Sequence, residues 1–212
     1  PENLVSGGDG AGVYLRTPDG DVAAMAGPGA DLAWTVERAN PLTAVLLVEG
    51  WYVRPAHGQR VARGRVRFHI HWNQPWVKVD HTFIVTRSND EITYAEIGIR
   101  WPLDAGHKRK ARFGRTAREP WEVDLSTAED AWIHQEAFPV YHKKQSLCRA
   151  GRGSEILDEG KEASGWCALH NGQAGMLVAV RDFAPQFPKE LTAGPNGIRS
   201  EERRVGKECR SR

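Results

Sequence analysis

The sequence predicts an all-β protein, and three observations support that prediction. Apolar and polar residues alternate over long stretches of the first 103 residues, as they do in half-buried strands. Short segments rich in Asn, Pro and Gly separate these stretches, which is typical of hairpin turns. The number of stretches and their even spacing indicate a closed or sandwiched antiparallel sheet.

The first strand is expected at residues 13–16, after a glycine-rich segment at 7–12. A phosphate-binding loop needs a helix directly after its glycines, so we interpret this segment as an ordinary flexible loop. Residues 18–21 (Pro-Asp-Gly-Asp) form a turn, because proline presets φ and glycine accepts a positive φ.

Five further strands are predicted before residue 103, at 32–38, 43–53, 65–72, 76–86 and 93–101. Alternation is clearest in the third of these, where four apolar residues share one face: Val66, Phe68, Ile70 and Trp72. The opposite face holds Arg65, Arg67, His69 and His71. Because large aromatic residues usually fill cores, we expect Trp72, Trp101 and Trp166 to be buried.

The pattern breaks at a basic segment, 106–118, which we interpret as a solvated linker. It separates a first domain at 1–105 from a second at 119–198. A nucleic-acid patch is the alternative for His107–Lys110, but no aromatic residues interleave its cations to stack on bases. We therefore expect no nucleic-acid partner.

The second domain is expected to consist of strands as well. Residues 126–129 (Ser-Thr-Ala-Glu) fit a helix capping box, yet 131–134 would equally continue a strand, and both alternatives stay open. Asn171-Gly172 is a strong hairpin signal between strands at 164–170 and 175–180.

The last fourteen residues, Arg199–Arg212, resemble the in-frame translation of a sequencing-library adapter, and we interpret them as an artefactual tail that does not belong to the protein. They contain six basic and three acidic residues, so the other 198 have 23 basic and 24 acidic residues. This balance gives no reason to expect an anionic membrane or nucleic acid as a partner. No apolar run approaches the ~20 residues that span a bilayer.

Two cysteines, Cys148 and Cys167, remain once Cys209 in the tail is set aside. Their spacing matches neither a zinc site nor a disulfide-rich scaffold. We favour two buried free thiols, with a single bridge as the alternative.

Three histidines lie near one another in the predicted hairpin: His69, His71 and His81. They resemble the histidine cluster of a metal site on a small β-barrel, but alternation places His81 on the apolar face and the other two on the polar face. We therefore expect no metal or other cofactor. His81 is predicted to be a hydrogen-bonded core residue, and the other two to be surface groups opposite Lys78 or Asp80.

A second polar cluster combines a potential base, a potential acid and cations: Trp132, His134, Glu136, Tyr141, His142, Lys143 and Lys144. A carbohydrate-cleaving site requires groups of these kinds. The alternative is a strand edge and a loop with solvated side chains, because no spacing in the cluster is diagnostic.

Seven short runs are 35–42 (TVERANPL), 48–51 (VEGW), 76–83 (WVKVDHTF), 97–103 (IGIRWPL), 164–166 (SGW), 180–183 (VRDF) and 187–191 (FPKEL). In their order and number they resemble the N-terminal part of the YetA-like/exo-rhamnogalacturonan lyase family. The resemblance implies a small RIFT-type β-barrel followed by a truncated β-sandwich. An α/α toroid would follow beyond Ile198, so we expect the chain to be a fragment, which leaves its localisation open.

Members of that family are similar to polysaccharide lyases that cleave uronic-acid-containing polymers by β-elimination. A base removes the proton α to the uronate carboxylate, a cation neutralises that carboxylate, and an acid protonates the leaving oxygen. The resemblance therefore implies a non-catalytic β-portion of such a lyase, with a polysaccharide partner and with calcium possible in the full-length protein. The alternative is a carbohydrate-binding or structural β-module of a larger surface protein.

No run matches a catalytic motif, so no catalytic residue is assigned. Five residues are the candidates for substrate binding: His134, Tyr141, His142, Arg181 and Lys189. Arg181 has an equal alternative as a buried hydrogen-bond donor that organises the turn into Pro185. The oligomeric state stays open.

Overall fold

A computed structural model describes residues 11–56, 58–88, 92–103, 109–115, 119–125, 129–137 and 147–203. The fold is all-β: no helix occurs in these residues, and 64% of them lie in strands. None of the described segments therefore provides a helix that could cross a membrane. The sheets are open and antiparallel, which confirms the all-β prediction, whereas closure of a RIFT-type barrel is not confirmed.

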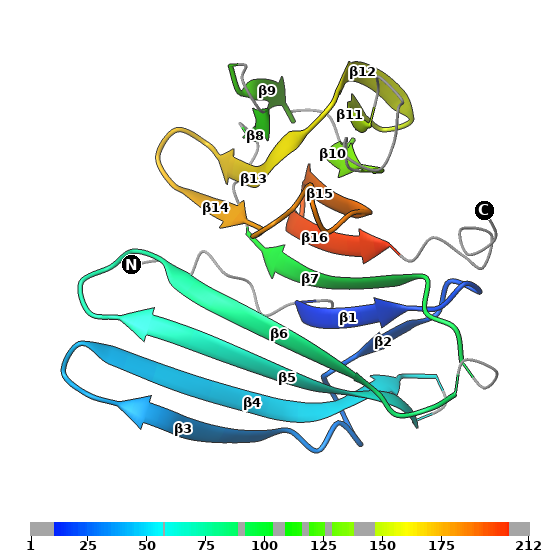
Figure 1. The fold of residues 1–212 in the computed structure, drawn as a ribbon, viewed down its shortest axis with the longest axis vertical. Coiled ribbons are helices and arrows are strands. Elements are labelled where there is room, and N and C mark those ends of the chain that lie inside the picture. Colours follow the sequence, from blue (N-terminus) through cyan, green and yellow to red (C-terminus); the bar gives the residue numbers. More distant parts are fainter. Residues whose placement is uncertain are drawn as a thin grey trace. The chain divides into compact units, whose positions relative to one another are not determined.

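The chain divides into two compact units, shown in Figure 1. The first unit is Val13–Ala95, and the second unit is Pro1–Gly12 with Glu96–Arg212. Along the chain, the first unit ends at Ala95 and the second unit resumes at Glu96. The sequence instead predicts a domain boundary at 106–118.

The described part of the first unit holds six strands: β1 (Gly12–Arg16), β2 (Val22–Ala24), β3 (Ala33–Ala39), β4 (Thr43–Arg54), β5 (Gln59–His71) and β6 (Val77–Val85). Strands β3, β4, β5 and β6 pair antiparallel in that order, while β2 pairs with β1 and with the end of β4. The side-chain oxygen of Asn40 accepts hydrogen bonds from the backbone N–H groups of Leu42 and Thr43, each at 2.9 Å, which explains why the chain turns between β3 and β4.

The core of the first unit lies near the end of β4 and the start of β5, where Tyr52, Val53, Val61 and Ala62 are buried. The hydroxyl of Tyr94 donates to the carbonyl of Val61 at 2.8 Å within this core. Beyond it, the β3–β4 and β5–β6 hairpins extend side by side, with their tips at the same end of the sheet (Figure 1). We call this part of the first unit the extended sheet.

The extended sheet has an apolar face that is partly open to solvent. Cross-strand pairing places the following residues on it: Trp34, Val36, Leu46, Val48, Val66, Phe68, Ile70, Val77 and Val79. Trp34 is 72% exposed and Trp72 is 75% exposed. The prediction that Trp72 is buried is wrong, because β5 ends at His71 and Trp72 lies in the hairpin turn.

The described residues of the second unit form ten strands: β7 (Glu96–Pro102), β8 (Lys110–Arg115), β9 (Trp121–Asp124), β10 (Ala131–Gln135), β11 (Cys148–Arg152), β12 (Glu155–Gly160), β13 (Ala163–His170), β14 (Gly175–Ala179), β15 (Lys189–Gly194) and β16 (Gly197–Arg203). Within this unit, strands of the larger sheet follow the order β12-β11-β10-β15-β16-β7, and the four-stranded sheet has the order β14-β13-β8-β9. Buried residues of both sheets form a common core, which includes Phe113, Ile133, Cys167, Leu169 and Leu191. This arrangement is a β-sandwich.

Two expectations for this region are corrected. Residues 110–115, assigned to a linker, form β8, because Ala111 and Phe113 alternate with polar residues and are fully buried. Residues 131–135 are strand, so the alternative of a helix there is wrong, whereas Ser126–Ala128 lie outside the described residues. Residues 199–203 of the predicted tail pair with β15 and β7 as part of β16, since strand pairing uses backbone groups that any residue except proline supplies in full.

Candidate functional site

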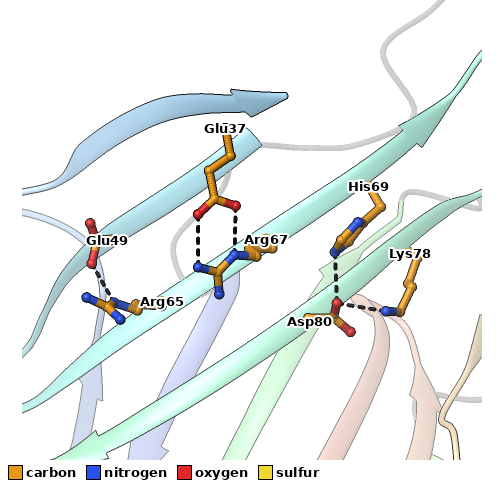
Figure 2. Close-up of polar contacts among 7 residues, drawn as sticks. All are labelled: Glu37, Glu49, Arg65, Arg67, His69, Lys78 and Asp80. Carbon is orange, nitrogen blue, oxygen red and sulfur yellow. Dashed lines mark hydrogen bonds and ion pairs between the residues drawn. The ribbon is translucent and has the colours of Figure 1, made fainter. Parts of the chain in front are cut away.

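The polar face of the extended sheet gathers charged side chains from four strands (Figure 2). It is the side opposite the apolar face, and its charged and imidazole groups are Glu37, Arg38, Glu49, Arg63, Arg65, Arg67, His69, His71, Lys78 and Asp80. We call it the charged face. Residues opposite each other in antiparallel strands point to the same side, and the register sets Glu49 opposite Arg65 and Arg67 opposite Asp80.

Glu37 and Arg67 form a bidentate ion pair (Figure 2). Glu37 lies where the pairing of β3 with β4 shifts between Val36 and Arg38, and such a bulge re-aims the side chain. Nε of Arg67 donates to Oε2 of Glu37 at 2.7 Å, and Nη2 donates to Oε1 at 2.9 Å. These hydrogen bonds lower the pKa of the Glu37 carboxyl and raise the pKa of the Arg67 guanidinium.

Glu49 of β4 is shared by two arginines of β5. Nε of Arg65 donates to its Oε1 at 2.6 Å, and Nη2 of Arg63 lies 3.8 Å from the same oxygen. The three side chains are 24 to 45% exposed, so solvent reaches all of them. Because one carboxylate faces two guanidinium groups, positive charge is in excess at this point.

Asp80 of β6 contacts two groups. Nζ of Lys78 donates to Oδ2 of Asp80 at 2.8 Å, and Nε2 of His69 lies 2.8 Å from the same oxygen (Figure 2). The hydrogen bond from Lys78, more than the one from His69, holds the pKa of Asp80 below its usual value.

A tryptophan lies at each end of the charged face. Trp51 pairs with Arg63 across β4 and β5, and the guanidinium of Arg60 lies 5.4 Å from the centre of its ring. At the other end, the rings of His71 and Trp76 are 4.9 Å apart.

This arrangement is suited to binding anions rather than to acid–base chemistry. A general base needs a pKa near the working pH, whereas Glu37 and Asp80 have lowered pKa values and are held by cations. Arginine and lysine side chains on a solvated surface can instead exchange their partners for the anionic groups of a ligand.

The structure separates the predicted substrate-binding residues of the second unit. Nδ1 of His134, on β10, lies 3.3 Å from Oε2 of Glu190, the residue opposite it on β15. Lys189 pairs with Gln135, so its side chain and that of His134 point to opposite faces of the sheet. Nζ of Lys189 donates to Oε1 of Gln186 at 2.8 Å, and burial lowers the pKa of this amine.

Arg181 is not a buried donor. Its side chain is 88% exposed, and Nε lies 3.3 Å from Oδ2 of the adjacent Asp182. The interpretation of Arg181 as a buried organiser of the turn is therefore wrong. Tyr141 and His142 lie outside the described residues, as do Lys143 and Lys144.

The three histidines of the first unit have the arrangement that alternation predicts. His81 pairs with Val66 on the apolar face and contacts the hydroxyl of Tyr52, which confirms it as a hydrogen-bonded residue. His69 lies opposite Lys78 and beside Asp80 on the charged face, as predicted. In the described part of the chain, no group of three or more His, Cys, Asp or Glu side chains is placed to hold a metal ion.

No protein-family model matches the sequence, and no curated protein matches it either.

Part of the charged face could be found from the sequence. Alternation correctly places Arg65, Arg67 and His69 on one side of a strand. The carboxylates of Glu37 and Glu49 lie on other strands, 30 and 16 residues away from their partners. The alternation of β4 and the turn at Asn40 could have indicated that Glu49 faces these arginines. The bulge that directs Glu37 to the same face has no signal in the sequence.

Proposed function

We propose that this chain is a non-catalytic β-portion of a polysaccharide lyase that acts on uronic-acid-containing polymers by β-elimination, and that it contributes carbohydrate contacts. The observation that supports this proposal most is the exposure of three tryptophans in the first unit: Trp34, Trp72 and Trp76 are 72%, 75% and 51% exposed. Exposed apolar surface of this extent marks a site of interaction rather than a folding requirement.

Tryptophan is well suited to this role. Its ring offers a large, flat apolar area, and its N–H group remains available to a polar partner. Trp72 and Trp76 lie at the two sides of the β5–β6 turn, where a ligand can reach both from solvent. An unbranched sugar polymer presents both apolar ring faces and hydroxyl groups, so it matches this chemistry.

Association with a polysaccharide is tested by affinity electrophoresis of the full chain in gels that contain polygalacturonate, rhamnogalacturonan or neutral dextran. We expect retardation by at least one polymer, and the Trp72→Ala/Trp76→Ala variant should bind about tenfold more weakly, since each aromatic contact contributes on the order of 0.5–1.5 kcal/mol. Leu177→Ala is the matched control, because Leu177 is 61% exposed on the second unit. Binding to none of the polymers would overturn the proposal.

The same samples test the non-catalytic assignment. β-Elimination leaves an unsaturated uronate, which absorbs in the ultraviolet. Bound polymer without this product supports the proposal, whereas its formation by the purified chain would show that the chain itself is catalytic.

A carbohydrate-binding or structural β-module of a larger surface protein is the second candidate, and the open apolar face of the extended sheet is compatible with it. The two candidates differ in the coding sequence expected beyond Ile198 in the genome. A long α-helical continuation favours the lyase, and repeated β-modules favour the second candidate.

A further inference from the structure

One strand of the charged face presents a continuous row of basic side chains. Every second residue of β5 from position 63 to 71 is an arginine or a histidine: Arg63, Arg65, Arg67, His69 and His71. Alternate residues of a strand point to the same side, so these five side chains share one face. At about 3.4 Å per residue, the row is about 27 Å long.

The carboxylates around this row do not neutralise it. Five cations, Arg38, Arg63, Arg65, Arg67 and Lys78, share this face with three carboxylates, those of Glu37, Glu49 and Asp80. Two positive charges are therefore in excess even when both histidines are neutral. Part of this excess lies at Arg63 and Arg65, which share Glu49 and are 45% and 43% exposed.

We propose that the row on β5 is a binding surface for an extended, unbranched polyanion, and specifically for the carboxylate-bearing chain of an acidic polysaccharide. The ligand lies along β5 and places its carboxylates against Arg63 and Arg65 first. This inference relies on the proposed function for the kind of polymer, and on the charge row for the surface and for the sign of the ligand.

The side chains of the charged face favour a polysaccharide over a nucleic acid. Single-stranded nucleic acids are held by aromatic side chains on which successive bases stack. The facing positions of β4 (43–49), β5 (63–71) and β6 (78–84) are all described, and none of them is Phe, Tyr or Trp. Trp51 and Trp76 lie only at the two ends of the row, so they do not provide a series of rings along it.

Glu49 provides a test with an expected gain of binding. In the free protein it holds Arg65 and Arg63, so it competes with any anionic ligand for them. Glu49→Gln removes this competitor and one negative charge while keeping the size of the side chain. A merely structural role of Glu49 gives no reason for tighter binding in this variant.

The experiment measures binding of the full chain to polygalacturonate, to the same polymer after full methyl esterification, and to single-stranded DNA, at low and at high salt. Arg63→Ala/Arg65→Ala should weaken binding to polygalacturonate about fivefold, and Glu49→Gln should tighten it about threefold, since each exposed charge contact contributes about 0.2–1 kcal/mol. Arg112→Ala is the control and should change nothing, because Arg112 is 47% exposed and lies on the second unit. Circular dichroism establishes that each variant is folded.

Each outcome bears on the inference. Weaker binding of the arginine variant, tighter binding of Glu49→Gln and loss of binding to the esterified polymer support it. Equal binding of the esterified and acidic polymers overturns it, and so does unchanged binding in both variants. The proposed function would still stand in either case if Trp72→Ala/Trp76→Ala weakens binding. Tighter binding to DNA than to polygalacturonate overturns the choice of a polysaccharide.

Discussion

The hydroxyl of Tyr52 lies 2.5 Å from Nε2 of His81 and joins β4 to β6 across the intervening strand. Tyr52 is fully buried; burial raises the pKa of its phenol and lowers the pKa of the His81 imidazole, so both groups are neutral near pH 7. The ring of Phe83 packs edge-on against Tyr52, with centroids 6.0 Å apart, on the same side of the sheet. The pair therefore places a neutral histidine at the boundary between the core and the extended sheet.

This neutral histidine predicts a loss of stability in mild acid. Burial lowers the pKa of His81 from 6.5 to about 4. Between these values the unfolded chain binds a proton that the folded chain does not, so the free energy of unfolding decreases as the pH falls from 6.5 to 4, by up to about 3 kcal/mol. Urea unfolding at pH 7 and pH 4.5, followed by tryptophan fluorescence, measures the difference.

His81→Gln is the informative comparison for this pH dependence. The glutamine can still accept a hydrogen bond from Tyr52, but it has no proton to gain in this range. We expect its free energy of unfolding to change less between pH 7 and pH 4.5 than that of the parent. An identical decrease in the two proteins would assign the pH dependence to other groups.

Gln135 forms a buried polar hub in the second unit, and its loss should be costly. Gln135 is fully buried, and its Oε1 accepts a hydrogen bond from the backbone N–H of Ala163 at 3.0 Å. Its Nε2 donates to the carbonyl of Leu147 at 3.3 Å and to the carbonyl of Lys161 at 3.1 Å. Gln135→Met keeps the volume but removes these hydrogen bonds; the N–H of Ala163 loses its side-chain acceptor, whereas the carbonyl of Leu147 keeps the backbone N–H of Glu136 at 2.8 Å. We expect the free energy of unfolding to fall by about 3 kcal/mol, measured by urea denaturation.

Gln173→Met is the control for this substitution, because Gln173 is exposed in the β13–β14 turn. It should change the free energy of unfolding by less than about 0.5 kcal/mol. A similar small effect of Gln135→Met would mean that the hub does not stabilise the fold.

The faces of individual strands could be predicted from the sequence, because the two-residue period of a strand is a local property. Arg67 and Phe68 lie on opposite faces as expected, and so do His69 and Ile70. Which faces are covered could not be predicted, because that depends on packing between distant segments. The exposure of Trp72 and the burial of Phe113 are the two clearest examples.

The charged face shows the same limit. Its arginines are evident in the alternation of β5, but their partners depend on the register of β3 and β4. A one-residue change of register moves a side chain to the other face, and the bulge at Glu37 is such a change. The basic residues Lys110 and Arg112 led to the prediction of a linker, but they alternate with Ala111 and Phe113, which form the buried face of strand β8.

Gly165 and Gly172 test the packing of the second unit as a matched pair. Both have a positive φ, +71° and +90°, so alanine at either position costs about 1–2 kcal/mol in backbone strain. A Cβ at Gly172 meets nothing within 4 Å, whereas at Gly165 it would overlap Phe183 and lie 2.9 Å from the carbonyl oxygen of Val180. Gly165→Ala should therefore lower the free energy of unfolding by about 1–3 kcal/mol more than Gly172→Ala. If urea denaturation gave the same decrease in the free energy of unfolding for both variants, the side chain of Phe183 would be able to move away from the new Cβ without destabilising the fold.

Cys148 and Cys167 should be inert thiols in the folded protein. Both are buried and unbridged in the core of the second unit, as favoured from the sequence. Burial raises the pKa of Cys148 to about 12 and also raises the pKa of Cys167, so neither forms the reactive thiolate near neutral pH. In a Cys209→Ser background, we expect no thiol to react with a disulfide reagent at pH 8, and two to react in urea, with or without prior reduction. A count in urea that rises from zero to two after reduction would reveal a disulfide between them, which the structure does not contain.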